Sequence, residues 1–293
     1  PIGGQRLFIE ARGTTTSTNN PVVFLAFEPG FGSEYLVPET RFLLGDPQDP
    51  DRALIYLDLL AQGRSSIADD GEDLISPISQ MRSIGNALTF LRENFFDEST
   101  RFDVVGHGYG ALMAVLFDAR NPGVFERMVL VSPYPIDVQD WARWQSTFRS
   151  DPRFDGKALV DLEISPRCAR DLDQCLIDQF WIYALPWVCE GNTQAFSDLQ
   201  INTADRAGQW FVERNLRNTS YDFSPDLLGV RAETTVITGD CDPIPEATFQ
   251  TYTSSIAGAQ RVRIPDAGFF PMTESRDAFR AQVRRALSPS TNP

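Results

Sequence analysis

The segment between Phe102 and Leu116 constrains the fold more strongly than any other part of this sequence. Its apolar first residues, Phe102–Val105, predict a buried strand, and Ala111–Leu116 are good helix formers. Between them, every second residue from Gly106 to Gly110 is glycine, which accepts the positive φ of a tight turn. The segment therefore predicts a strand that turns directly into a helix, the unit from which helix-covered parallel sheets are built.

Similar apolar runs recur along the chain and alternate with helical patterns. The predicted strands are Arg6–Ala11, Val22–Phe27, Ala53–Leu59, Phe102–Val105, Arg127–Ser132, Thr234–Thr238 and Arg261–Ile264. Ser76 and Pro77 predict the start of a helix that runs to about Phe96, and a final helix carries Phe279 and Val283. This alternation predicts an α/β fold with a doubly wound, mostly parallel sheet.

The pattern changes between Pro135 and about Ser224, where tryptophans and acidic residues recur at helical spacing with little strand signal. We expect a helical cap over residues 135–224, inserted into a core formed by residues 1–134 and 225–293. A chain of 293 residues accommodates one α/β domain with such an insertion.

Composition limits the partners and the compartment. The chain carries 26 basic and 40 acidic residues, a formal net charge of −14, so a nucleic-acid partner is not expected. It has no run of about eighteen apolar residues, so no membrane span is expected. Pro1–Gly4 shows neither the charged nor the apolar region of a signal peptide, which favours the cytoplasm unless a leader has been removed.

The four cysteines, Cys168, Cys175, Cys189 and Cys241, fit no zinc signature, and the only histidine is His107. We therefore expect no metal and no cofactor. On one continuous helix, Cys168 and Cys175 would lie about 10 Å apart, too far to bridge. Three of the four cysteines fall in one segment, so the sequence leaves open whether two of them form a disulfide.

The glycine turn has the frame of the G-x-S-x-G nucleophile elbow, with Gly108 at the serine position. Four further segments, in the same chain order, make the sequence resemble the proline iminopeptidase branch of the α/β-hydrolase fold over nearly its whole length. These segments are Leu7–Gly13, Tyr56–Ser66, Gly239–Asp242 and Asp266–Pro271. The resemblance implies a Ser-His-Asp site, and its base and acid positions fall on Phe269 and Asp242.

Two of these three positions cannot perform the family's chemistry. Gly108 has no oxygen to attack a substrate, and Phe269 cannot accept a proton. Asp242 has no histidine to orient, so we expect a structural carboxylate that accepts backbone N–H groups. His107 precedes the nucleophile position, where the side chain packs away from the pocket, so we expect a structural or hydrogen-bonded role.

The oxyanion loop is altered as well. The family's H-G-G-P-G corresponds to Ala26–Gly30, so Phe27 and Glu28 replace its two glycines. A bulky ring and a carboxylate oppose the stabilisation of developing negative charge. Glu28 either points to solvent or faces the pocket, in which case it is the best candidate for a new acid or base.

Two cap segments also resemble the family, whose cap carboxylates hold a peptide's amino terminus. Trp187–Gly191 is similar to its W-E-G stretch, so Glu190 matches one of these carboxylates. Asp205–Phe211 is similar to R-I-E-N-H-Y-F, where Ala207 replaces the second glutamate. The resemblance thus implies that recognition of an amine is half lost.

These observations favour a repurposed, non-hydrolytic enzyme that acts on an apolar small molecule without a covalent acyl intermediate. Cyclisation, isomerisation or elimination would suit one working carboxylate: Glu28, Asp242 or Glu190. The alternative is a non-catalytic binder or sensor, a pseudoenzyme, that uses the same pocket. A third hypothesis, a hydrolase with Cys241 or Asp242 as nucleophile, lacks any feature that positions either residue.

The pocket should persist under the cap, at the carboxyl ends of the strands. The residues expected to line it are Phe27, Gly108, Tyr109, Glu190, Phe269 and Phe270. A buried Glu28 with a raised pKa would favour catalysis, and an exposed Glu28 would favour binding alone.

Overall fold

The computed structural model describes residues 6–17, 19–45, 52–66, 75–218 and 220–288, and these contain one seven-stranded sheet. The strands are β1 (Phe8–Arg12), β2 (Val22–Leu25), β3 (Leu54–Asp58), β4 (Phe102–His107), β5 (Phe125–Val131), β6 (Glu233–Gly239) and β7 (Gln260–Ile264). Their order across the sheet is β1-β3-β2-β4-β5-β6-β7. Strand β1 is antiparallel to β3 and every other pair is parallel, which confirms the predicted doubly wound, mostly parallel sheet.

All seven predicted strands are present, but β2 ends at Leu25 rather than at Phe27. Beyond Leu25 the chain leaves the ladder and turns toward the start of the next helix. The carbonyl groups of Ala26 and Phe27 accept the N–H groups of Gly110 and Tyr109 instead of bonding to a neighbouring strand. The apolar run predicted a strand because it is wholly buried, yet its last residues are buried in a loop.

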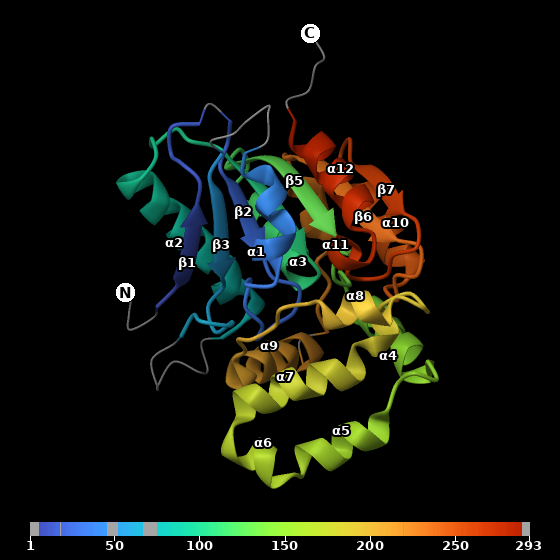
Figure 1. Ribbon diagram of the computed structural model, residues 1–293. Helices are drawn as coiled ribbons and strands as arrows, with labels where there is room; N and C mark the ends of the chain where they lie inside the picture. Colours follow the sequence, from blue (N-terminus) through green and yellow to red (C-terminus); the bar gives the residue numbers. More distant parts are fainter. Residues whose placement is uncertain (1–5, 18, 46–51, 67–74, 219, 289–293) are drawn as a thin grey trace.

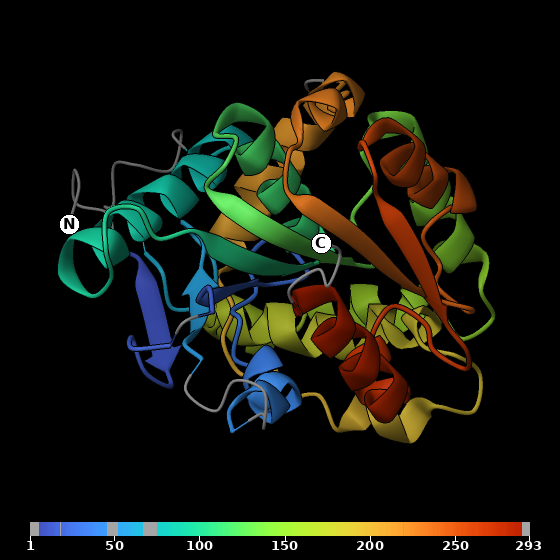
Figure 2. The same ribbon diagram turned by 90° about the horizontal axis from the view of Figure 1, so that it is seen from above.

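Helices cover both faces of the sheet (Figure 2). Helices α2 (Pro77–Asn94), α3 (Tyr109–Arg120) and α10 (Glu246–Ser255) lie on one face, and α1 (Leu36–Thr40) and α12 (Arg276–Leu287) lie on the other. The start predicted for α2 is confirmed, because the Ser76 hydroxyl accepts the N–H of Ser79 at 3.1 Å. The final predicted helix is α12. Short helical turns complete this part: η1 (Arg41–Leu43), η4 (Ser224–Gly229) and α11 (Pro271–Glu274).

The segment between β5 and η4 is helical in the residues described, and Figure 1 shows it at the end of the sheet where the parallel strands finish. Its elements are α4 (Val138–Ser150), α5 (Gly156–Glu163), α6 (Pro166–Arg170), α7 (Leu172–Tyr183), η3 (Leu185–Trp187), α8 (Thr193–Ser197) and α9 (Arg206–Asn218). This arrangement is that of the expected cap, although the exact division into core and cap stays a prediction.

A disulfide joins Cys168 to Cys175, whose Cα atoms lie 4.7 Å apart. The distance expected for one continuous helix does not apply, because the helix is interrupted between α6 and α7. Asp171 ends the first helix and caps the second, since its carboxylate accepts the N–H of Gln174 at 2.9 Å. The sharp turn at this residue brings the two sulfur atoms together.

Candidate functional site

The backbone of the elbow is retained at Gly108, between the end of β4 and the start of α3. Its φ is +52° and its ψ is −115°, a conformation that glycine adopts without the strain a side chain would cause. The N–H of Gly108 donates to the carbonyl of Val131, and its own carbonyl accepts the N–H of Tyr134 at 3.0 Å. Strand β4 therefore turns as the sequence predicted.

The main chain of Phe27 occupies the position where catalysis would occur. In a nucleophile elbow, the N–H of the residue after the nucleophile supplies one donor of the oxyanion hole. Here that group, the N–H of Tyr109, donates to the Phe27 carbonyl at 2.7 Å. A Cβ atom placed on Gly108 would overlap this carbonyl oxygen and would lie 2.8 Å from Cζ of Phe269. Neither a serine side chain nor a substrate oxyanion fits this arrangement.

His107 is a buried structural residue, in line with the role expected for it. Its Nε2 lies 2.8 Å from the carbonyl oxygen of Phe269, and its Nδ1 lies 2.8 Å from the hydroxyl of Tyr35. Because a carbonyl only accepts, Nε2 carries the hydrogen and the Tyr35 hydroxyl donates to Nδ1. Burial lowers the pKa of His107 to about 3, so the ring is neutral in this network.

Phe269 occupies the base position and is fully buried. Its N–H donates to the carbonyl of Trp187 at 2.7 Å, which ties this loop to the cap. Its ring centroid lies 4.5 Å from that of His107, 5.0 Å from Trp187 and 5.0 Å from Phe270. The position that the resemblance assigned to the base therefore carries a phenyl ring packed among other aromatic rings.

The structure brings three of the expected lining residues together. The ring centroid of Phe27 lies 5.4 Å from that of Phe270 and 6.2 Å from that of Phe269, and all three residues are fully buried. Tyr109 is buried beside them, but its hydroxyl donates to the side chain of Gln80 in α2 at 2.7 Å. That hydroxyl therefore already has a hydrogen-bond partner in α2.

Glu28 is buried, with 6% of its surface exposed, and its Oε2 atom has no hydrogen-bond partner. Burial, reinforced by the charge of Glu213 in α9, raises the pKa of the Glu28 carboxyl well above its ordinary value. This shift favours the neutral form of the carboxyl, which carries one O–H. A buried Glu28 with a raised pKa is the environment that we expected of a catalytic residue rather than of one that only binds.

Two tyrosines belong to the same electrostatic cluster, and the sequence motifs did not indicate either. The charges of Glu28 and Glu213 raise the pKa values of Tyr134 and Tyr183, although burial is the larger cause for both. Tyr134 follows β5 at the carboxyl edge of the sheet, and its hydroxyl accepts the indole N–H of Trp141 at 3.0 Å. Its position just after a central strand is the one signal that could have identified it.

Asp242 lies in the loop after β6. Its Oδ1 accepts the N–H of Ile244 at 3.1 Å, as expected for a structural carboxylate, whereas its Oδ2 is buried without a hydrogen-bond partner. Burial raises the pKa of Asp242 to about 7, against the opposing effect of the nearby Ser132 hydroxyl.

The two cap positions matched to amine recognition lie outside this cluster. Both Glu190 and Ala207 are exposed to solvent. The structure therefore does not bring Glu190 together with Glu28 or with the aromatic residues.

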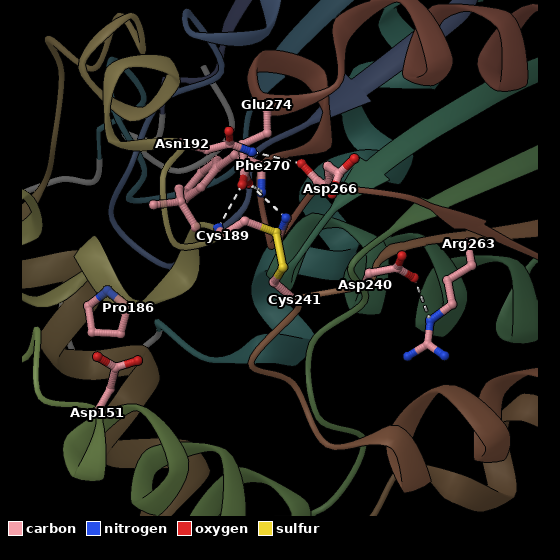
Figure 3. Close-up of a disulfide and its surroundings, with 12 residues drawn as sticks. Asp151, Pro186, Cys189, Asn192, Asp240, Cys241, Arg263, Asp266, Phe270 and Glu274 are labelled. Atoms are coloured by element: carbon pink, nitrogen blue, oxygen red, sulfur yellow. Dashed lines mark hydrogen bonds and ion pairs between the residues drawn. A yellow bond between two sulfur atoms is a disulfide. The ribbon is translucent and has the colours of Figure 1, made fainter.

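A second disulfide, which the sequence did not predict, joins Cys189 of the cap to Cys241, directly before Asp242 (Figure 3). The carboxylate of Glu274 lies beside it and accepts the N–H of Cys189 at 2.8 Å and those of Gly268 and Phe270 at 2.9 and 3.2 Å. The disulfide and this carboxylate thus fasten the cap to the two loops that carry the former acid and base positions.

Comparisons with known proteins agree with this architecture. The sequence profile of the "Alpha/beta hydrolase family" matches residues 22–282. Similar solved structures include a proline iminopeptidase from Mycobacterium smegmatis, with 18% identity, coverage of 98% of this chain and 96% of that chain, and a TM-score of 0.68. An esterase from Exiguobacterium antarcticum is 16% identical, with 98% and 97% coverage and a TM-score of 0.66.

An enol-lactonase from Burkholderia xenovorans LB400 is 19% identical, with 98% coverage of both chains and a TM-score of 0.63. At these identities the structural likeness shows the fold alone. Comparison with curated proteins gave no match. Within the residues that the structure describes, no helix is long and apolar enough to cross a membrane.

Proposed function

Because the chain belongs to the alpha/beta hydrolase family, we propose that it has kept the family's fold while losing serine-hydrolase chemistry. One observation carries this proposal: the Phe27 carbonyl accepts the Tyr109 N–H and occupies the space that a side chain at Gly108 would need. Loss of one oxyanion-hole donor typically lowers the rate by about 10²–10³-fold. Here the nucleophile, the base and an oxyanion donor are lost together.

The activity that we propose is non-hydrolytic, with Glu28 as a general acid toward an apolar small molecule. Cyclisation, isomerisation and elimination each need a proton delivered or removed in a site that excludes water. The buried Glu28 carboxyl has the raised pKa that such a proton donor requires, and its Oε2 has no partner among the described residues. No covalent intermediate on the protein is involved.

One observation favours the alternative, a non-catalytic binder or sensor. The rings of Phe27, Phe269 and Phe270 pack against one another at the former reaction centre, so they provide apolar contact surface rather than chemistry. A protein of this kind would retain a ligand without converting it.

Incubation with a mixture of apolar metabolites, analysed by mass spectrometry, distinguishes the two functions. We expect the wild type to consume one component, and Glu28→Gln to consume it at least about 10²-fold more slowly. Glu190→Gln, which alters an exposed carboxylate, is the matched control and should behave as the wild type. Retention of a component without conversion would support the binder instead.

We further infer that the protein folds in an oxidising compartment. All four cysteines are paired, Cys168 with Cys175 and Cys189 with Cys241. Structural disulfides persist in secreted or lumenal proteins and are rare in the reducing cytosol. The pairing thus argues against the cytoplasmic location expected from the lack of a signal-peptide pattern, and it fits the alternative in which a leader has been removed. The net charge of −14 supports the absence of a nucleic-acid partner.

A further inference from the structure

A chain of four aromatic rings links the cap to the loop after β5. The ring centroids of Tyr134 and Trp144 lie 5.2 Å apart, those of Trp144 and Trp187 lie 5.2 Å apart, and those of Trp187 and Tyr183 lie 5.4 Å apart. We call these four residues the ring cluster. It also contacts the former base position, since the Phe269 ring lies 5.0 Å from Trp187 and stacks on Trp144 at 6.4 Å.

Three hydrogen-bonding groups of the ring cluster are buried and have no partner among the residues that the structure describes: Nε1 of Trp144, Nε1 of Trp187 and the hydroxyl of Tyr183. An indole N–H can only donate, so both tryptophans need an acceptor. Buried polar groups in folded proteins are almost always paired, and each exception needs an explanation. Several donors that lack an acceptor among the described residues of one continuous cluster favour an acceptor supplied by a bound molecule.

We propose that the ring cluster binds a neutral, flat, apolar molecule through a carbonyl oxygen, as in a conjugated aromatic ketone. The proposal rests on the function proposed above and names its substrate class. A flat ring system would stack against the cluster, and the carbonyl oxygen, which has two lone pairs, would accept from one or two of the unpaired groups.

Hydrogen-bond pairing and charge disfavour the two other ligand classes that such a cluster could attract. An ammonium group would leave both indole N–H groups unpaired, because an N–H cannot accept its hydrogens. A carboxylate would meet the negative field of Glu213, which acts on Glu28, Tyr134 and Tyr183. A neutral acceptor avoids both penalties. The ring cluster therefore departs from the amine recognition that the cap resemblance implied.

The test uses four naphthalene probes of nearly equal size: 2-acetonaphthone, 2-ethylnaphthalene, 2-naphthoate and 2-naphthylmethylammonium. Binding to the full chain at pH 7 is followed by ligand-observed saturation-transfer NMR. We expect the ketone to bind at least about tenfold more tightly than each of the others, the difference that one or two hydrogen bonds make.

Tyr183→Phe removes one unpaired hydroxyl but keeps the ring, and it should weaken ketone binding by about three- to tenfold. Tyr56→Phe is the matched control, because that hydroxyl, in β3, bonds to Thr40 of α1 and does not belong to the ring cluster. It should leave ketone binding unchanged. Circular dichroism establishes that both variants are folded.

Tighter binding of the carboxylate or the ammonium probe, equal binding of the ketone and 2-ethylnaphthalene, or no binding by any probe would overturn the assignment. So would a Tyr183→Phe variant that binds the ketone as the wild type does. Metabolite conversion reports separately on the proposed function. Ketone binding without any conversion would remove the catalytic role and keep this inference, whereas conversion without ketone binding would do the reverse.

Discussion

The carbonyl oxygen of Phe27 accepts the backbone N–H of Tyr109 at 2.7 Å, so the main chain fills its own oxyanion position. This contact and the glycine at 108 depend on each other. A side chain at position 108 would displace the Phe27 carbonyl, and restoring a free N–H at Tyr109 would require the loop after β2 to move. The loss of hydrolysis that we propose therefore rests on the backbone as well as on the side chains at positions 108 and 269.

A small side chain at Gly108 should be strongly destabilising. Gly108→Ala would place a Cβ against the Phe27 carbonyl and 2.8 Å from Phe269, at a residue with φ of +52°. We expect the free energy of unfolding to fall by about 3 kcal/mol or more. Gly123 has a φ of +87° and open space around it, so Gly123→Ala is a control for the strained backbone conformation alone. We expect it to lower the free energy of unfolding by about 1–2 kcal/mol. Equal losses in urea titrations of the two variants would contradict the filled site.

Truncation of the Phe269 ring should also lower stability. The residue is fully buried, so Phe269→Ala should cost about 3–5 kcal/mol. Phe95→Ala, at a ring that is 54% exposed, should change stability by less than about 0.5 kcal/mol. Thermal and urea unfolding measure both variants. A tolerated Phe269→Ala would mean that the ring borders empty space rather than filling the core.

Removal of the disulfide between Cys189 and Cys241 should cost more than removal of the other one. It spans 52 residues and would contribute about 4 kcal/mol by loop closure. The bond between Cys168 and Cys175 spans seven residues, which corresponds to about 2–3 kcal/mol. Paired Cys→Ser variants, unfolded in urea, test this order. A reversed order would show that Cys189–Cys241 does not fasten the cap to the core.

The raised pKa of Asp242 predicts a specific pH dependence of stability. The folded state keeps this proton up to about pH 7, whereas the unfolded chain loses it near pH 4. The contribution of Asp242 is therefore complete below about pH 4 and is lost as the pH rises through 7. Between pH 5 and pH 8, the free energy of unfolding of Asp242→Asn should rise by about 2 kcal/mol relative to that of the wild type. Asp277→Asn, an exposed carboxylate in α12, is the matched control.

Much of the fold could be predicted from the sequence because its signals are local. Buried parallel strands are nearly continuous apolar runs, and Ser76 with Pro77 marks a helix start by cap chemistry alone. The positions of Gly108 and Phe269 at the site likewise follow from the motifs in which they lie. The buried role of His107 follows from its place before the turn, since a residue there faces the core beneath the elbow.

The remaining features depend on how distant segments meet. Nothing in the run around Phe27 indicates that its carbonyl would bond to Tyr109, because that contact depends on where β2 and α3 meet. The ring cluster draws Tyr134 and Trp187 from separate elements, so no spacing in the sequence reveals it. The bond between Cys168 and Cys175 depends on a helix break at one aspartate.

We infer that this chain has lost serine hydrolysis through its backbone as well as its side chains. The most direct test treats the wild type and the double variant Gly108→Ser with Phe269→His with a fluorophosphonate probe and with a proline arylamide. We expect no stoichiometric labelling of either protein and no turnover, because the Phe27 carbonyl still occupies the Tyr109 N–H. Labelling of the wild type, or turnover by the double variant within about tenfold of an ordinary family hydrolase, would contradict the account.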